Sequence, residues 1–250
     1  MMEEGISKAA RLIRESQKPA VFTGAGISAE SGIPTFRGEN GVWKKYDPEV
    51  LELDYFYRYP EESWKVIKEI FYNFMHEAKP NAAHHALAAI EKLKNKITII
   101  TQNIDHFHQQ AGNTDVVEFH GTTAFLLCEK CQKKYQADKK MLERIPPHCP
   151  ECKSVLKPDF VFFGEGIPPE AYARSFQIAA SCDLMIVVGT SGEVMPANMI
   201  PQEARRHGAY IVEINPEKKV FAFEPRDVYI KGKAGEVLPK IVKALEGNSF

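Results

Sequence analysis

The chain has 250 residues, a formal net charge of -1 and 44% hydrophobic residues, which is typical of a globular protein with one large core or a core domain and a smaller companion. This near neutrality excludes an overall electrostatic attraction to nucleic acid or to an anionic membrane. No apolar run approaches the roughly 20 residues that span a bilayer, and the acidic Glu3 and Glu4 are not typical of a signal peptide. We therefore expect a cytoplasmic protein that binds neither membrane nor, directly, nucleic acid.

Short apolar segments alternate with amphipathic segments along the chain. Residues 3–16 carry apolar side chains at helical spacing, and residues 20–22 form an apolar run that leads into a glycine turn. The other predicted elements are, in chain order, a helix at 80–93, strands at 97–100, 116–119, 184–188 and 210–214, and a helix at 235–246. Strands that alternate with helices predict an α/β fold with a Rossmann-like, doubly wound parallel sheet.

Two segments interrupt this alternation. Residues 39–79 are rich in aromatic side chains, and residues 122–157 contain four of the five cysteines. We interpret the first as a helical module and the second as a zinc-binding module, which pack together as a smaller domain. The Rossmann-like domain then comprises residues 1–38, 80–121 and 158–250.

A glycine-rich turn follows the first predicted strand. Gly24, Gly26 and Ala29 fit the spacing Gly-x-Gly-x-x-Gly/Ala, in which glycines permit a tight turn and the close approach of a pyrophosphate at a helix N-terminus. Alone, the motif fits a nucleotide site and an empty turn equally well. The acidic residue expected about 20 residues later to bind a ribose is absent, so a nucleotide would not lie as in a standard dehydrogenase. The segment up to Gly38 predicts a loop that covers the site, in which Arg37 can meet phosphate.

Four cysteines form two Cys-x-x-Cys pairs, Cys128 with Cys131 and Cys149 with Cys152. In a chain without an export signal, paired cysteines indicate metal ligands rather than disulfides, and this spacing is typical of a four-cysteine zinc site. Four thiolates leave no position for water, so the zinc is predicted to be structural. His148 is an alternative ligand, although a solvated loop histidine is the better interpretation. A zinc ribbon can also bind nucleic acid, but acidic residues interleave with its lysines and favour a solvated surface.

Polar side chains follow two further predicted strands. Gln102, Asn103 and Asp105 suit a sugar and an amide-bearing ring, whereas Asn103 or Asp105 equally suits the cap of a helix at 106–111. His120 ends the next strand, where an imidazole with an ordinary pKa of about 6.5 is well placed as a general base. A purely structural histidine is the alternative at this position.

Together these segments resemble the sirtuin family of NAD-dependent protein-lysine deacylases. The matching motifs occur in the family's order and cover most of the chain. They are the two cysteine pairs and residues 23–28, 32–38, 101–105, 119–121, 161–165, 189–191 and 214–215.

The resemblance implies an NAD site, with NAD as a consumed cosubstrate. The implied NAD contacts are Gly24, Ala25, Gly26, Ala29, Phe36 and Arg37 in the glycine turn and its loop, Gln102, Asn103, Ile104 and Asp105 around the nicotinamide and its ribose, and Gly189, Thr190, Ser191, Asn215, Lys233 and Ala234 around the phosphates and the adenosine. His120 is implied as the base that accepts a proton from a ribose hydroxyl. The implied products are nicotinamide, deacylated lysine and O-acyl-ADP-ribose, and one structural zinc is implied at the four cysteines.

The resemblance also implies an acylated-lysine protein or peptide as substrate. Val161 and Phe162 would line the tunnel for the acyl-lysine side chain. The segment Val161, Phe162, Phe163, Gly164 and Glu165 would pair as a strand with the extended substrate backbone, a mode of recognition that tolerates different substrate sequences.

Three positions predict the substrate preference. Relatives that prefer acidic acyl groups resemble one another in a Tyr-x-x-Arg, where this chain has Lys68 and Phe71. Since a buried carboxylate without a cation is costly, we expect weak desuccinylation, with Lys68 as a partial substitute for the arginine. Glu193, near the peptide groove, predicts a preference for basic residues beside the acyl-lysine.

Several other functions stay open at this point. One is a deacylase that prefers longer or acidic acyl groups, and another is a protein ADP-ribosyltransferase, which would share the NAD pocket. An NAD-dependent oxidoreductase is disfavoured by the missing ribose acid. A zinc-ribbon binding module without catalysis is disfavoured by the neutral net charge.

Overall fold

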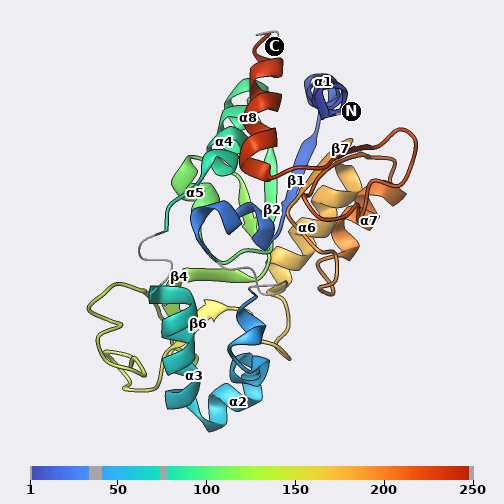
Figure 1. Cartoon of the computed structure of the whole chain (residues 1–250). Helices are drawn as coiled ribbons and strands as arrows, with labels where there is room; N and C mark the ends of the chain where they lie inside the picture. Colours follow the sequence, from blue (N-terminus) through green and yellow to red (C-terminus); the bar gives the residue numbers. More distant parts are fainter. Residues whose placement is uncertain (1, 34–40, 74–77, 248–250) are drawn as a thin grey trace.

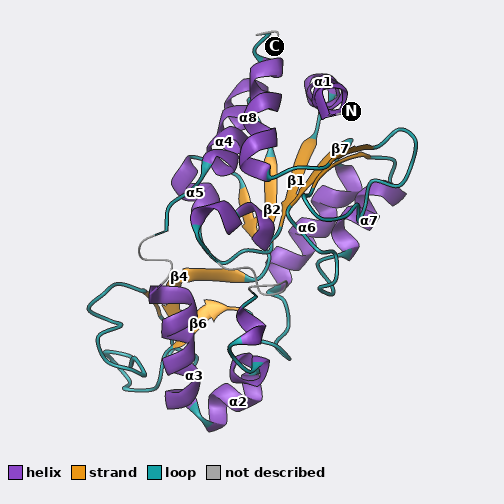
Figure 2. Ribbon diagram, in the orientation of Figure 1, coloured by secondary structure: helices purple, strands orange, loops and turns teal. Residues whose placement is uncertain are grey.

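The computed structural model of the chain describes residues 2–33, 41–73 and 78–247. Figure 1 shows two regions, which we call the sheet region (top) and the small region (bottom). Strands lie at the centre of each, as Figure 2 shows. Within the described residues, no helix is both long and apolar enough to cross a membrane.

Six parallel strands form the sheet of the upper region in the order β3-β2-β1-β7-β8-β9. They are β1 (Pro19–Thr23), β2 (Thr98–Thr101), β3 (Val116–Glu118), β7 (Leu184–Val188), β8 (Tyr210–Ile214) and β9 (Val228–Ile230). The central strands β1 and β7 are buried along their whole length, which explains their continuous apolar sequences. The strand order reverses between β1 and β7, and ligands bind at such a switch point in doubly wound sheets.

Helices cover both faces of this sheet (Figure 2). The first face carries α1 (Met2–Glu15), α4 (Ala82–Lys94) and α8 (Ala234–Leu245), and the second carries α6 (Pro169–Ser181) and α7 (Met199–Arg206). Val21 belongs to the apolar cluster of the first face and Phe22 to that of the second, because consecutive side chains of a strand point to opposite faces.

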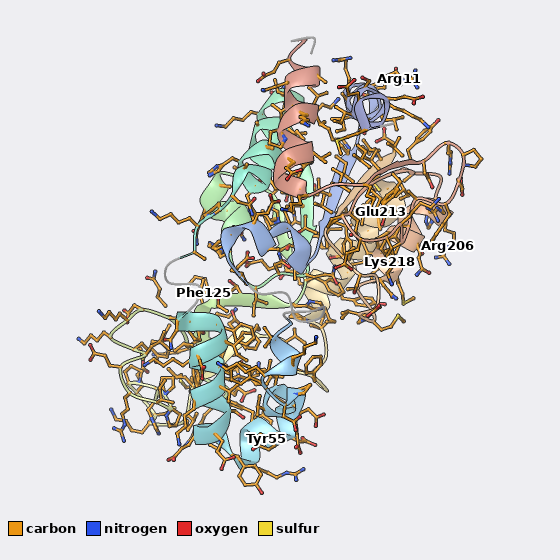
Figure 3. The ribbon with its side chains drawn as sticks, in the orientation of Figure 1. Arg11, Tyr55, Phe125, Arg206, Glu213 and Lys218 are labelled. Atoms are coloured by element: carbon orange, nitrogen blue, oxygen red, sulfur yellow. The ribbon has the colours of Figure 1, made fainter. Side chains whose placement is uncertain are left out.

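The small region combines the helical segment with the cysteine segment. Its elements are η3 (Val42–Lys44), η4 (Pro48–Leu51), α2 (Leu53–Arg58), α3 (Pro60–Ile67), the π-helical η5 (Lys68–Asn73) and the antiparallel strands β4 (Gly121–Leu127), β5 (Lys134–Gln136) and β6 (Lys157–Phe160), in the order β5-β4-β6. The buried Trp64 indole N–H donates a 2.9 Å hydrogen bond to the Leu156 carbonyl and so joins the two segments. Figure 3 places Phe125 of β4 where the two regions meet and Tyr55 of α2 at the far end.

The predicted fold class is confirmed: a doubly wound parallel sheet carries a smaller unit with a helical part and a four-cysteine part. The predicted domain boundaries stay a prediction, and β6 runs across the boundary set at residue 158. The glycine turn continues into two short 3-10 helices, η1 (Ala25–Ile27) and η2 (Ala29–Ser31), instead of one long helix. The second of them ends at Gly32, whose φ of 84° is a left-handed conformation that suits glycine.

Candidate active site

A cavity of about 770 Å³ lies between the two regions, at the carboxyl ends of β1, β2, β7 and β8. It brings together the predicted residues Gly24, Ala25, Gly26, Gln102, Asn103, Ile104, His120, Val161, Phe162, Phe163, Gly164, Glu165, Gly189, Thr190, Ser191 and Asn215. Four other predicted residues, Ala29, Asp105, Lys233 and Ala234, are not part of its lining. Phe36 and Arg37 lie outside the described residues.

Three glycines bring two loops into contact at the switch point of the sheet. The Gly26 N–H donates a 2.8 Å hydrogen bond to the Gly189 carbonyl, and the Gly24 N–H donates to the carbonyl of Val188 at 3.0 Å. A Cβ atom on Gly26 would lie 2.7 Å from the Gly189 Cα, closer than real structures allow. The chain therefore uses glycine here because only bare backbone fits, which leaves main-chain surface open toward the cavity.

Side-chain amides tie together the strand ends that line the cavity. The Gln102 amide donates to the Thr190 hydroxyl at 3.1 Å. The Asn215 amide donates to the Thr190 carbonyl at 2.9 Å. Three strand ends, those of β2, β7 and β8, are thus held together by polar side chains at one edge of the sheet.

A buried polar network lies beneath the cavity floor. The Ser28 hydroxyl donates to Asp105 Oδ2 at 2.6 Å, and the Asn103 amide donates to the Ser28 hydroxyl at 3.1 Å and to the Gly24 carbonyl at 3.2 Å. Asp105 Oδ1 also accepts the Phe107 N–H at 3.0 Å, at the start of α5 (Phe107–Ala111). Asp105 therefore caps this helix and also fixes Ser28, whereas the Asn103 side chain is committed to the glycine turn. Burial raises the pKa of the Asp105 carboxyl.

Two buried histidines continue this network. His108 Nε2 lies 3.0 Å from the Thr23 hydroxyl, and its ring is 5.0 Å from that of His84. His84 also caps α4, since the Asn81 N–H donates to its Nδ1 at 3.2 Å. Burial lowers the pKa of His84 to about 3 and that of His108 to about 4, so both rings are neutral at pH 7. Both rings therefore pack in the interior of the sheet region, and His84 also caps a helix.

His120 lies two residues beyond the end of β3 and lines the cavity. Its Nδ1 lies 3.0 Å from the Gln102 carbonyl oxygen, which can only accept, so Nδ1 carries the proton. Burial lowers the pKa of His120, while the hydrogen bond to Gln102 acts in the opposite direction. The ring is therefore neutral at pH 7, and its Nε2 lone pair is available to accept a proton.

The segment of residues 161–165 forms the wall beside His120. The Val161 N–H donates to the His120 carbonyl at 2.9 Å. The Phe163 N–H donates to the Leu51 carbonyl at 2.9 Å, and its carbonyl accepts the Leu53 N–H at 3.0 Å. This segment is thereby attached to the base on one side and to the helical part of the small region on the other.

Several lining residues were not predicted from the sequence. They are Leu51, Phe160, Gly166, Ile167, Tyr172, Val194, Met195, Pro196, Pro216, Glu217 and Lys218. Phe160 directly precedes a recognised motif, and that adjacency was a usable signal. Leu51 comes from the aromatic segment, whose approach to the sheet no periodicity in the sequence indicates.

The four predicted zinc ligands form one cluster. Their sulfur atoms all lie within 4.8 Å of one another, with Cys128 and Cys152 3.3 Å apart and Cys131 and Cys149 3.7 Å apart. Four thiolates at about 2.3 Å from a tetrahedral zinc lie about 3.8 Å from one another, so the arrangement fits the ion. His148 Nδ1 donates instead to the Pro146 carbonyl at 2.8 Å. The donor set is therefore four sulfurs, as expected for a structural zinc.

Known proteins resemble the chain over its whole length. The model of the Sir2 family matches residues 24–196. An "NAD-dependent protein deacetylase 1" of Pyrobaculum aerophilum is 41% identical over 98% of this chain and 96% of its own length. An "NAD-dependent protein deacylase" of Pyrococcus abyssi is 43% identical over 95% of this chain and 96% of its own.

Solved structures agree with these sequences. A Sir2 homolog–NAD complex has a TM-score of 0.87 and 37% identity, and it covers 97% of this chain and 94% of its own. A Sir2–p53 peptide–NAD+ complex has a TM-score of 0.86 and 36% identity, and each chain covers 100% of the other. The chain belongs to the Sir2 family, which confirms the family predicted from its motifs.

Proposed function

We propose that this chain is an NAD-dependent protein-lysine deacetylase that consumes NAD and releases nicotinamide and O-acyl-ADP-ribose. The observation that carries this proposal is the single cavity in which the glycine turn, His120 and the segment of residues 161–165 meet. Further support comes from relatives at 41% and 43% identity that are named as an NAD-dependent protein deacetylase and an NAD-dependent protein deacylase.

The sheet region supplies the residues that would hold NAD. When bound, NAD supplies a ribose carbon whose bond to nicotinamide breaks and an ADP-ribose that accepts the acyl group. Gln102 and Asn103 would contact the nicotinamide ribose, and Ile104 with Asp105 would orient the carboxamide. The main chain at the glycine contacts, with Thr190, Ser191 and Asn215, would hold the phosphates and the adenosine. Ala29, Phe36, Arg37, Lys233 and Ala234 stay predicted contacts.

His120 would act as the general base. Because Nδ1 donates to the Gln102 carbonyl, the imidazole is held in the tautomer whose Nε2 faces the reaction as an acceptor. The lowered pKa keeps this nitrogen unprotonated at neutral pH. A neutral, fixed imidazole can remove the proton of a ribose hydroxyl so that its oxygen attacks the acyl carbon.

Apolar side chains would enclose the acyl-lysine. Phe71, Phe160, Val161 and Phe162 line the cavity beside Ile104, which suits a methylene chain that ends in a small uncharged acyl group. Apolar walls also exclude water from the reacting atoms.

The two positions that set the acidic-acyl preference support weak desuccinylation. The Lys68 ammonium donates to the Leu142 carbonyl at 2.7 Å, and Lys68 is not part of the cavity lining, whereas Phe71 is. A succinyl carboxylate in this space would therefore lack a cationic partner, which is a costly arrangement.

Zinc would serve the small region as a structural ion. The four sulfurs are clustered without disulfide bonds between them and fit a tetrahedral ion, so the role of Cys128, Cys131, Cys149 and Cys152 would be to hold the small region together. A cytoplasmic location is part of this proposal, since a reducing compartment keeps such thiols available for metal. The domain boundaries predicted from the sequence are proposed as well, except that β6 packs with the small region.

One experiment tests the reaction. The protein is incubated with NAD and peptides that carry acetyl-, succinyl- or long-chain acyl-lysine, and the products are identified by mass. We expect O-acetyl-ADP-ribose and nicotinamide with the acetyl peptide, little turnover with the succinyl peptide, and a loss of about 10²-fold to 10⁴-fold in His120→Ala. Transfer of labelled ADP-ribose to protein, without deacetylated peptide, would refute the proposal in favour of a protein ADP-ribosyltransferase.

A further inference from the structure

An ion pair joins a buried lysine to the last residue of the wall formed by residues 161–165, and the proposed chemistry does not use this pair. Lys157, the first residue of β6, has a side chain that is only 4% exposed, and its ammonium lies 2.9 Å from Glu165 Oε2. The Glu165 side chain is 26% exposed and lines the cavity. Lysine is rarely buried to this degree without a role that offsets the loss of hydration.

The ammonium group stands at the centre of the turn that carries the wall. Its Nζ donates to the Phe160 carbonyl at 2.8 Å and to the Pro158 carbonyl at 3.3 Å. It also lies 4.6 Å from the centroid of the Phe162 ring. One cation thus contacts the main chain before the wall, the ring within it and the carboxylate at its end.

Glu165 closes the turn from the other side. Its Oε2 accepts the Phe162 N–H at 2.8 Å, and its own N–H donates to the Phe162 carbonyl at 3.1 Å. The position of Phe162, which is 2% exposed and lines the cavity, is therefore fixed through both its backbone and its ring. Because the neighbouring Val161 is bonded to the His120 carbonyl, the geometry of the turn also sets where the wall stands relative to the base.

We propose that Lys157 and Glu165 are positioning residues that hold the wall in its peptide-binding geometry, an inference that rests on the proposed function. A role in stability alone is a weaker explanation, because buried ion pairs can often be replaced by apolar residues at no cost in stability. The pair holds the turn of residues 160–165 in one geometry. This turn carries the main chain and the aromatic ring that would contact the substrate.

The test uses Lys157→Met, Glu165→Gln and the double variant in steady-state deacetylation of an acetyl-lysine peptide. We expect each single change to raise the peptide KM about tenfold or more, as for loss of a hydrogen bond to a buried charge. The KM for NAD should stay within about twofold, since the pair does not touch the glycine turn. The double variant should resemble the single variants rather than multiply their effects, because both act through one turn.

A matched control removes a nearby exposed pair. Lys134 lies 2.8 Å from Asp159 of the same strand, β6, but its side chain is 58% exposed. Lys134→Ala should leave the peptide KM unchanged.

The outcomes separate the two proposals. Absence of wild-type turnover would refute the proposed function. If the wild type turns over normally and the folded single variants keep the wild-type peptide KM, only the positioning role is refuted. The positioning role is also refuted if the losses of activity in the single variants add in the double variant, follow the melting temperature, and change the KM for NAD as much as the KM for the peptide. If Lys157→Met fails to fold, Glu165→Gln decides, since the glutamine has the same shape and can still accept the Phe162 N–H.

Discussion

The two regions that enclose the cavity are built on different physical principles. In the sheet region, polar groups gather at the strand ends and hold one another above an apolar core, as Ser28, Asn103 and Asp105 do. In the small region, aromatic side chains such as Phe71 and Phe162 face the cavity, and four clustered thiols lie in the apolar core behind them. In the proposed function, the sheet region would supply the reacting and NAD-binding groups, and the small region would supply the shape of the acyl-lysine site.

Four buried titratable groups of the sheet region agree with this difference between the regions. Burial raises the pKa of Asp105 and lowers those of His84, His108 and His120. Every one of these shifts favours the uncharged form. Burial is the main cause of each of these shifts, so the four side chains are shielded from solvent.

The largest expected effect comes from removing one of the four predicted zinc ligands of the small region. Cys128→Ser should abolish zinc binding, since structural zinc contributes an apparent ~10–16 kcal/mol that is folding free energy. Hydrogen exchange should then show lost protection in α3 and β4 but retained protection in β1 and β7, and deacetylation should fall to background.

Cys182 provides a matched control for this change. It is a buried cysteine in the apolar cluster beneath α6 and α7, outside the four-thiol cluster. Cys182→Ser should keep one zinc per chain. If β1 and β7 lost protection together with α3 in Cys128→Ser, the two regions would be one cooperative unit and the comparison would fail.

The next largest effect concerns the switch point of the sheet. In Gly26→Ala the new Cβ would lie 2.7 Å from the Gly189 Cα, so one of the two loops must move. We expect the KM for NAD to rise at least about tenfold, as for a loss of 1.4 kcal/mol or more of binding energy. Gly166→Ala is the control, because its Cβ would meet nothing within 4 Å. Equal KM values for NAD in both variants would show that the glycine contact is not needed.

The sequence predicted the central sheet well because its strands are buried on both faces. Such strands appear as continuous apolar runs, and β7 and β8 have the bounds expected from residues 184–188 and 210–214. The helices α6 and α7 and the strand β9 were not predicted. The reason is physical: α6 buries only Ser175 and Ala179 fully, and β9 has three residues, so neither carries a clear apolar period.

The residues of the candidate site likewise fall into those that the sequence predicts and those that it does not. Cysteine spacing predicts the zinc ligands because two knuckles must point at one ion, and the four sulfurs do cluster. The strand-end residues Gln102, Asn103 and His120 also meet, since parallel strands end at one edge. Leu51 could not be predicted, because its place in the cavity depends on how the small region packs against the sheet. The Lys157–Glu165 pair likewise needs coordinates, since a lysine in a sequence is normally solvated.

The pH dependence of activity would distinguish a His120 shielded from solvent from a solvated one. A general base must be unprotonated, so activity is lost as pH falls through its pKa. Since burial lowers the pKa of His120, we expect the acid limb of kcat/KM for the acetyl peptide, at saturating NAD, to lie below pH ~6.5, the ordinary value for histidine. A limb above this value would mean that the imidazole is solvated or paired with a negative charge.

The smallest expected effect concerns the solvent-exposed rim of the cavity. Glu193 lines the cavity mouth and lies 3.6 Å from Lys218, with side chains 51% and 61% exposed. Because solvent and Lys218 both screen this carboxylate, it should favour peptides with basic over acidic residues beside the acyl-lysine by only about twofold to threefold at low salt. Glu193→Gln should remove that preference, whereas Glu217→Gln, which removes a neighbouring acid of the lining, should keep it. Equal affinities of wild type and Glu193→Gln for both peptides would show that the rim, unlike the interior, does not select substrates by charge.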